Sequence, residues 1–202
     1  MKAYLPRRLI GALLLAVATA APAGAAPATS VPEKWHTPYQ LYLTPREAYD
    51  MKQADPAGTL LIDVRTRAEV KFIGLAQGVD ANIPVRTLDP EYRWSEKKNT
   101  YRTKRNPGFV AAVERLLSAR GLDRESPIIL MCQSGSRAPI AARELHKAGF
   151  TTVYTQYQGF EGRKATDGPS KGQRVIEGWK HAGLPWSYDL DPEQMYFNWS
   201  GD

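Results

Sequence analysis

The sequence predicts a single α/β domain with a central, mostly parallel sheet and helices on both faces. Two observations support this fold class. The runs 59–64 and 127–131 are apolar and contain β-branched residues, which is typical of strands buried on both faces of a parallel sheet. Amphipathic segments with capping residues alternate with these runs, as in proteins whose helices cover such a sheet.

The first expected element is a helix from Thr44 to about Ala54. Thr44 can cap the first amides, Pro45 suits the first helical turn, and Glu47 completes a capping box. A proline and a glycine end this helix, and the strand at 59–64 follows them. These two elements begin the alternating pattern.

The rest of the chain continues this pattern up to its C-terminal tail. The remaining expected elements are a short strand at 82–85, a long loop at 88–105 without a clear period, a helix that begins at Asn106 and ends at Gly121, the strand at 127–131, a helix at 137–148, a last strand at 153–154 and a helix near 174–182. Ligands of parallel sheets bind where strands end and helices begin, so the residues after 127–131 are the first place to look for a site.

The N-terminus has the features of a signal peptide. Three basic residues precede an apolar run at 9–21, and Ala23-Gly24-Ala25 provides an A-x-A cleavage site. The run is too short to span a bilayer comfortably. We therefore expect cleavage after Ala25, a periplasmic or secreted protein, and no stable membrane insertion after cleavage. The sequence leaves open whether the Sec or the twin-arginine route exports it.

The predicted organisation is a signal peptide at 1–25, a linker at 26–40, one domain at 41–186 and a C-terminal tail at 187–202. The formal net charge is +6, and three of the basic residues lie in the first ten positions. That excess is too small to indicate a nucleic-acid-binding protein. It is compatible with a preference for small anions.

Cys132, the only cysteine, follows the strand at 127–131 and precedes a short loop, so no intramolecular disulfide can form. The loop is Gln133-Ser134-Gly135-Ser136, and Arg137 begins the next helix. Such a loop can point several backbone amides inward at a helix N-terminus, where they favour the nucleophilic thiolate. The alternative is a buried structural cysteine that acts only as a small hydrophobic residue.

Four segments, in the right order, resemble those of rhodanese domains. They are Cys132-x-x-Gly135-x-Arg137, Asp63-Val64-Arg65 with Glu69, Asn82-Ile83-Pro84, and Gly178-Trp179 with Ala182-Gly183-Leu184-Pro185. The resemblance covers about 41–185. It departs from the family where 74–81 lacks a histidine and where the loops at 88–105 and 159–173 are longer than usual.

This resemblance implies a sulfurtransferase in which Cys132 forms a persulfide. The amides from Gln133 to Arg137 would hold the transferred sulfur and its oxyanion. Asp63 and Arg65 match a segment that mainly supports structure, and Trp179 is expected in the core. The implied donor is thiosulfate or a related small anion. Since no second cysteine can resolve the persulfide, the acceptor is an external thiol, cyanide or a partner protein.

Two other functions remain as alternatives. The fold could be a binding module without turnover, or a sulfur carrier for a periplasmic partner, with the aromatic residues of 187–202 as a docking surface. A phosphatase or arsenate reductase shares the loop from cysteine to arginine but has five intervening residues, whereas four intervene here. We therefore expect negligible phosphatase activity.

No cofactor is expected, and the spacing of the three histidines indicates no metal site.

The loop at 88–105 is unusually basic. Its basic residues are Arg93, Lys97, Lys98, Arg102, Lys104 and Arg105. Since it follows the strand at 82–85, it should emerge at the same sheet edge as Cys132. We expect it to border the site and to attract an anionic sulfur donor. A solvated surface loop with no such role is the equally weighted alternative.

Overall fold

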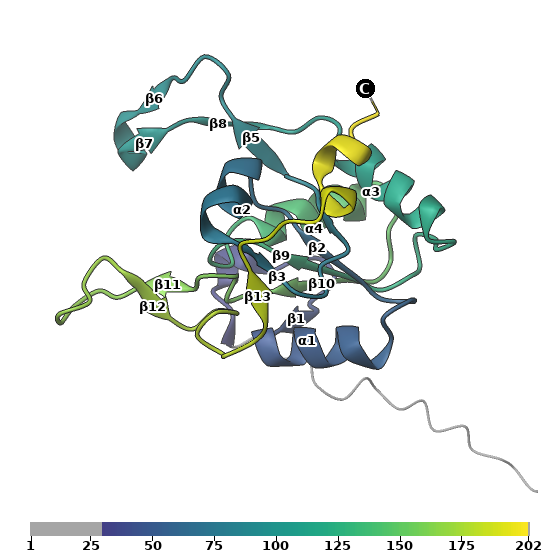
Figure 1. The fold of residues 1–202 in the computed structure, drawn as a ribbon, viewed down its shortest axis with the longest axis horizontal. Helices are drawn as coiled ribbons and strands as arrows, with labels where there is room; N and C mark the ends of the chain where they lie inside the picture. Colours follow the sequence, from purple (N-terminus) through teal and green to yellow (C-terminus); the bar gives the residue numbers. More distant parts are fainter. Residues whose placement is uncertain (1–29, 202) are drawn as a thin grey trace, which may run out of the picture.

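The computed structural model describes residues 30–201, so the expected signal peptide and its cleavage site lie outside the described residues. A five-stranded parallel sheet with the order β1-β10-β9-β2-β4 forms its centre (Figure 1). Its strands are β1 (Tyr42–Leu43), β2 (Leu60–Asp63), β4 (Ala81–Asn82), β9 (Ile128–Met131) and β10 (Val153–Gln156). The predicted fold class is confirmed.

Helices cover both faces of the sheet. They are α1 (Pro45–Ala54), α2 (Arg67–Ile73), α3 (Phe109–Ala119) and α4 (Ala138–Lys147). Alternate residues of β2 face opposite cores: Leu60 and Ile62 pack with α3 and α4, whereas Leu61 packs with side chains of α1 and α2. This burial on both faces explains why the strand sequence is continuously apolar.

The register of β2 and β9 sets the position of the site. Ile62 pairs with Leu130 and Asp63 with Met131, so both strands end at the same level. Cys132 is the next residue after Met131 and therefore lies at the carboxyl edge of the sheet, beside the turn that follows Asp63. The expected strand at 82–85 is shorter, because pairing with β2 extends only over Ala81–Asn82.

The expectation of an irregular loop at 88–105 is wrong. The segment 86–105, here called the first arm, is a twisted antiparallel ribbon. Its elements are β5 (Arg86–Leu88), β6 (Trp94–Ser95), the 3-10 turn η3 (Glu96–Lys98), β7 (Thr100–Tyr101) and β8 (Thr103–Arg105). Strands of two or three residues are too short to show a hydrophobic period in the sequence, and only their cross-strand pairing defines them.

The expected helix near 174–182 is also wrong. The segment 163–176, here called the second arm, pairs β11 (Arg163–Lys164) antiparallel with β12 (Arg174–Ile176). Glu177 and Gly178 then have φ values of 62° and 95°, which a right-handed helix does not allow. Strand β10 is not the last strand either, because β13 (Trp186–Ser187) pairs with β3 (Leu75–Ala76) after it.

The segments on both sides of the domain pack against it. The segment 30–40 includes the short turn η2 (Glu33–Trp35). Its residue Val31 is buried, and the hydroxyl of Tyr39 donates a hydrogen bond to the carbonyl of Phe150 at 2.8 Å. The tail forms η4 (Pro192–Gln194) and η5 (Tyr196–Asn198). There the Tyr196 hydroxyl donates to Asn106 Oδ1 at 3.1 Å.

The tail aromatics do not form one exposed surface. Tyr196 and Trp199 pack on the core, whereas Tyr188 and Phe197 are exposed. Among residues 30–201, no helix has the length and apolar character needed to cross a membrane.

Candidate functional site

Cys132 lies at the centre of the loop between β9 and α4. Its side chain is buried, with 0% of its surface exposed. Sγ accepts hydrogen bonds from the backbone amides of Gly135 at 3.2 Å and Arg137 at 3.4 Å. Arg137 is the N-cap residue of α4, so the sulfur faces the positive end of that helix. This arrangement stabilises negative charge on the sulfur.

The loop keeps this shape because backbone approaches it very closely. Gly135 has a φ of 93°, and a Cβ there would lie 1.8 Å from the carbonyl oxygen of Tyr157. The Phe160 amide donates to the Cys132 carbonyl at 2.7 Å, and the Glu161 amide donates to the Gln133 carbonyl at 2.9 Å. The segment after β10 therefore fixes the Cys132 loop from behind, and Gly135 cannot be replaced without moving it.

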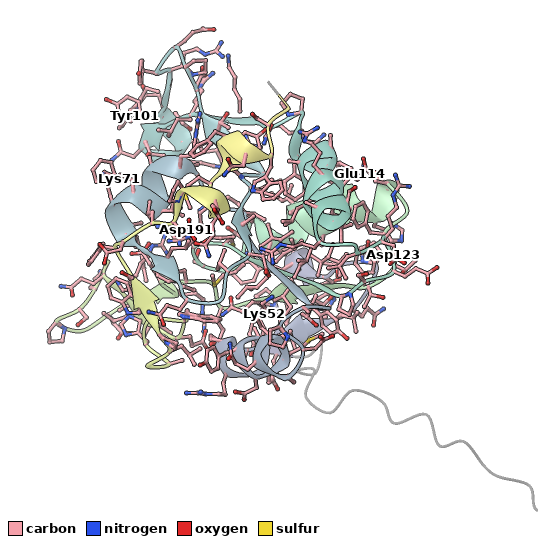
Figure 2. All side chains as sticks on the ribbon, turned by 45° about the vertical axis from the view of Figure 1, so that its right-hand side comes forward. Lys52, Lys71, Tyr101, Glu114, Asp123 and Asp191 are labelled. Atoms are coloured by element: carbon pink, nitrogen blue, oxygen red, sulfur yellow. The ribbon has the colours of Figure 1, made fainter. Side chains whose placement is uncertain are left out.

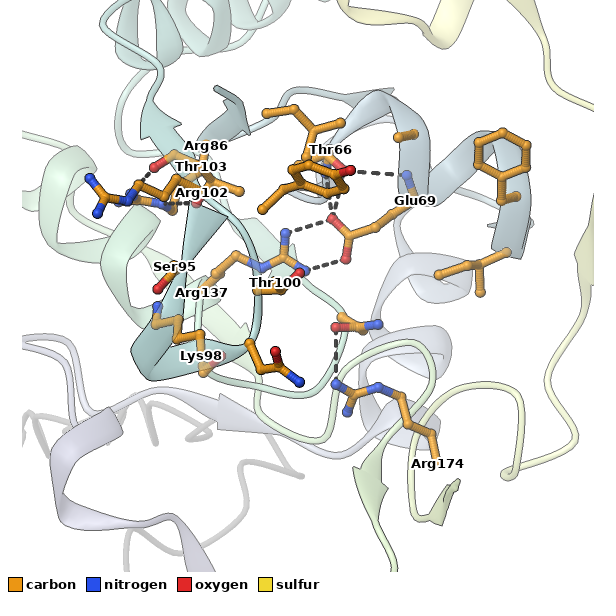
Figure 3. A pocket seen from close by; sticks show the side chains of 18 of the residues that line it. Thr66, Glu69, Arg86, Ser95, Lys98, Thr100, Arg102, Thr103, Arg137 and Arg174 are labelled. Carbon is orange, nitrogen blue, oxygen red and sulfur yellow. Dashed lines mark hydrogen bonds and ion pairs between the residues drawn. The ribbon is translucent and has the colours of Figure 1, made fainter. Parts of the chain in front are cut away.

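Arg137 makes a forked ion pair with Glu69 from α2. Arg137 Nη1 lies 2.7 Å from Glu69 Oε2, and Nη2 donates to Oε1 (Figure 3). Burial raises the pKa of Glu69, but the hydrogen bonds and charge of Arg137 outweigh burial, so the pKa is lowered overall. Burial lowers the pKa of Arg137, but Glu69 outweighs it, so that pKa is raised. Both groups therefore stay charged at neutral pH.

Thr66 holds Glu69 in turn. The Glu69 amide donates to the Thr66 hydroxyl at 3.2 Å, and the Thr66 amide donates to the Glu69 carboxylate at 2.9 Å, which completes a capping box at the start of α2. The sequence Thr66-x-x-Glu69 carries this capping signal, although the expected elements include neither α2 nor a partner for Glu69. Arg137 is distant from Glu69 in sequence, so only the fold brings the two together.

Asp63 and Arg65 form a fully buried ion pair behind the loop. Arg65 Nη2 lies 2.6 Å from Asp63 Oδ2 and donates to the Gly74 carbonyl at 2.8 Å, with both side chains at 0% exposure. Asn82 Nδ2 donates to the backbone carbonyls of Asp63 and Arg65 at 3.0 and 2.9 Å. Neither side chain lines the cleft described below. These contacts hold the turn after β2 in place, and the structural role of Asp63 and Arg65 stays a prediction.

A large cleft of about 1220 Å³ opens above the Cys132 loop. Gln133, Ser136 and Arg137 form part of its wall, whereas Cys132 does not. A molecule in the cleft therefore meets the loop before it meets the sulfur. Gln133 Nε2 donates to Glu161 Oε2 at 2.7 Å, which orients this part of the wall. Of the residues 133–137 expected around the sulfur, only Gly135 and Arg137 place amides against it.

Both arms contribute to the same cleft. The two hairpins project from one side of the body, with α2 between them (Figure 1). The residues 98–103 of the first arm and Lys164 and Arg174 of the second line the cleft. The first arm therefore borders the cleft beside the Cys132 loop, where the sequence predicts it, and its role in attracting an anion stays a prediction. The sequence pattern does not anticipate Arg174 there, because it indicates a helix at that position.

Several basic residues of the first arm hold the arm together or attach it to the body. Arg93 Nε lies 2.7 Å and Lys104 Nζ 3.3 Å from the carboxylate of Asp89. The hydrogen bond from Arg93 lowers the pKa of Asp89 to about 2, so these bonds persist down to that pH. Arg105 Nε pairs with Glu144 at 2.8 Å.

Other basic residues of the arms face the cleft. Lys98 and Lys164 line it, and neither ammonium group has a hydrogen bond or ion pair within residues 30–201. Arg102 lines it while its Nε donates to the Trp94 carbonyl at 2.8 Å. Arg174 Nη2 donates to the Gln133 side chain at 3.1 Å. Figure 3 shows Lys98, Arg137 and Arg174 around this cleft.

No group of three or more His, Cys, Asp or Glu side chains within residues 30–201 is placed to hold a metal ion. The site itself combines the thiol, the converging amides, the Arg137–Glu69 pair and the basic walls of the cleft.

The chain is similar to several known proteins. Uncharacterized protein RC0915 of Rickettsia conorii is 28% identical over 142 residues, which cover 70% of this chain and 93% of that protein. The crystal structure of Rv0390 from M. tuberculosis is similar with a TM-score of 0.52 and 29% identity, covering 73% of this chain and 97% of that one. A polysulfide-sulfur transferase homodimer from Wolinella succinogenes gives a TM-score of 0.39 and 26% identity, covering 72% of this chain and 77% of that one.

Residues 44–166 match the family described as "Rhodanese-like domain". The match begins at the N-cap of α1 and ends inside the second arm, so it includes the Cys132 loop, Glu69 and the first arm. The chain therefore belongs to the rhodanese-like domain family, which includes sulfurtransferases.

Proposed function

We propose that this protein is a sulfurtransferase that carries a sulfane sulfur as a persulfide on Cys132. The observation that carries this proposal is the pair of amides, from Gly135 and Arg137, directed at Sγ. They stabilise a thiolate before the reaction and a negatively charged persulfide after it. A buried structural cysteine has no need of such donors.

The first step is attack by the Cys132 thiolate on the outer sulfur of thiosulfate or a related donor. A new bond forms between Sγ and that sulfur, the sulfur–sulfur bond of the donor breaks, and sulfite leaves with the electron pair. No oxidant or reductant is required. The basic walls of the cleft favour an anionic donor of this kind, because a local excess of positive charge raises the encounter rate of anions.

In the second step an external nucleophile takes the outer sulfur. Its attack breaks the bond inside the persulfide and returns Cys132 to the thiolate. Arg137 stays charged throughout because Glu69 holds it, so it can balance negative charge at the mouth of the loop. Since Cys132 is the only cysteine, the acceptor comes from outside the chain.

Mass spectrometry of the mature protein after exposure to thiosulfate tests this proposal. We expect the mass of one sulfur atom to be added on the peptide that contains Cys132, and cyanide to remove it. Thiosulfate supplies the sulfur, and omission of thiosulfate is the control. A protein that stays unmodified with thiosulfate and with polysulfide would instead favour a binding module without turnover.

We also propose that the protein is exported and begins at Ala26. The basic residues, the apolar run and the A-x-A site at the N-terminus support this proposal. N-terminal sequencing of protein recovered from the extracytoplasmic fraction should give a chain that starts at Ala26. A chain that still starts at Met1 in that fraction would contradict it.

A further inference from the structure

We propose that the cleft between the two arms docks the sulfur acceptor, and that this acceptor is an acidic polypeptide segment carrying a cysteine. The inference rests on the proposed function and adds the chemical class of the acceptor. It is drawn from the size of the cleft, the charge of its walls and the apolar side chains exposed in it.

The cleft is larger than a small acceptor needs. Its volume of about 1220 Å³ exceeds the roughly 300–1,000 Å³ typical of pockets that take drug-sized ligands. Cyanide or a small thiol would leave most of it filled with water. The wall of the cleft includes residues 98–103 of the first arm, the Cys132 loop and the second arm. An extended chain segment can contact all three parts of this wall.

The charge of the walls selects an acidic segment. The basic residues that line the cleft are Arg86, Lys98, Arg102, Arg137, Lys164 and Arg174, whereas Glu69 is the only carboxylate among the described residues of its wall. Glu69 is already engaged by Arg137. The ammonium groups of Lys98 and Lys164 have no hydrogen bond or ion pair within residues 30–201, so they are available to carboxylates of a bound chain.

The apolar side chains in the cleft argue for a polypeptide rather than an inorganic anion. Phe72 on α2 is 76% exposed, Tyr101 on β7 is 55% exposed and Leu88 on β5 is 44% exposed, and all three line the cleft. Tyr101 lies in the outer part of the first arm, away from Lys52 on α1 (Figure 2). Burying these side chains requires a partner with apolar side chains of its own.

The chemistry of transfer explains why the segment carries a cysteine. Its thiolate attacks the outer sulfur of the Cys132 persulfide, a new sulfur–sulfur bond forms on the acceptor, and Cys132 leaves as a thiolate. The loop at the base of the cleft lies over Cys132, so a chain docked between the arms has its thiol near the persulfide.

The test measures transfer from preloaded protein to designed peptides. The full mature chain is loaded with thiosulfate, freed of donor, and mixed with the peptide Glu-Leu-Glu-Phe-Cys-Gly-Glu-Leu-Glu or with the same peptide carrying Gln in place of every Glu. We expect the glutamate peptide to accept sulfur at least about tenfold faster at low salt, with the advantage shrinking at high salt.

A charge-matched pair of triple variants separates the cleft from the overall charge. The cleft variant combines Lys98→Gln, Arg102→Gln and Lys164→Gln, and in it the advantage of the glutamate peptide should fall several-fold. The control variant combines Lys71→Gln, Lys147→Gln and Lys171→Gln, whose positions are exposed and outside the cleft wall, and there the advantage should persist. All proteins are loaded to the same sulfur content, and each peptide rate is divided by the rate of transfer to 2-mercaptoethanol, which is small and uncharged, so that effects of a variant on loading or on the persulfide itself cancel.

A third variant tests the apolar contacts. Phe72→Ser should slow transfer to the glutamate peptide but not to 2-mercaptoethanol, since Phe72 is exposed and contributes little to the core. If Cys132 takes up no sulfur, the proposed function fails. If Cys132 takes up sulfur but both peptides accept it equally fast, or the two triple variants behave alike, only the acceptor inference fails.

Discussion

Replacing Cys132 with serine should reduce sulfur transfer from thiosulfate by roughly 10³-fold or more, because it removes the nucleophile. Serine has nearly the same volume, and the amides of Gly135 and Arg137 that now face Sγ would donate to the hydroxyl. The variant should therefore remain folded, with a free energy of unfolding within about 2 kcal/mol of wild type. Release of sulfite from thiosulfate and the far-UV spectrum measure the two properties.

Ser136→Ala is the matched control for this prediction. Ser136 lies in the same loop, is exposed and lines the cleft, and its side chain makes no hydrogen bond within residues 30–201. We expect it to retain activity within a few-fold of wild type. A folded Cys132→Ser variant that releases sulfite at the normal rate would show that another group is the nucleophile.

Replacing Asp63 with asparagine should lower the free energy of unfolding by about 3–5 kcal/mol, because it leaves the guanidinium of Arg65 buried without a counter-charge. Arg65 cannot escape to solvent. It donates to the Gly74 carbonyl at 2.8 Å, and its guanidinium lies 4.1 Å from the centre of the Phe160 ring. Such a loss is a large part of the roughly 5–15 kcal/mol that stabilises an ordinary domain.

Urea unfolding measures this loss. Asp50→Asn on the exposed side of α1 is the control, and it should change the free energy of unfolding by less than about 0.5 kcal/mol. Activity per folded molecule should be unchanged in Asp63→Asn, since Asp63 does not line the cleft. A stable Asp63→Asn variant with low activity would give Asp63 a direct role in the reaction.

Much of the sheet and most of the helices are predictable from local sequence. Leu60–Asp63 and Ile128–Met131 are buried on both faces, so their sequences are almost entirely apolar. Helix α1 begins at the Thr44 capping box, as expected, and α4 follows the Cys132 loop. Each of these signals is local, because burial and capping leave a pattern within one segment of chain.

The expectations that fail concern short hairpin strands, which are defined by cross-strand pairing and not by a pattern within one strand. The first arm is held by Arg93 and Lys104 around Asp89 and by short antiparallel pairs, none of which has a period of its own. The second arm replaces an expected helix because positive φ values follow β12 directly. Helix α2 differs from both arms, because the capping signal at Thr66 is local and allows the start of this helix to be predicted from the sequence.

The sequence by itself determined the fold class, the place of Cys132 at the end of a buried strand, and the loop of small residues that leads to Arg137. These properties follow from residue type and spacing within short segments. Only the tertiary structure decided that Glu69 holds Arg137, that Asp63 and Arg65 are fully buried, and that the two arms meet in one cleft. Ion pairs and cleft walls join residues far apart in the chain, and the free energy that selects such partners comes from packing the whole domain.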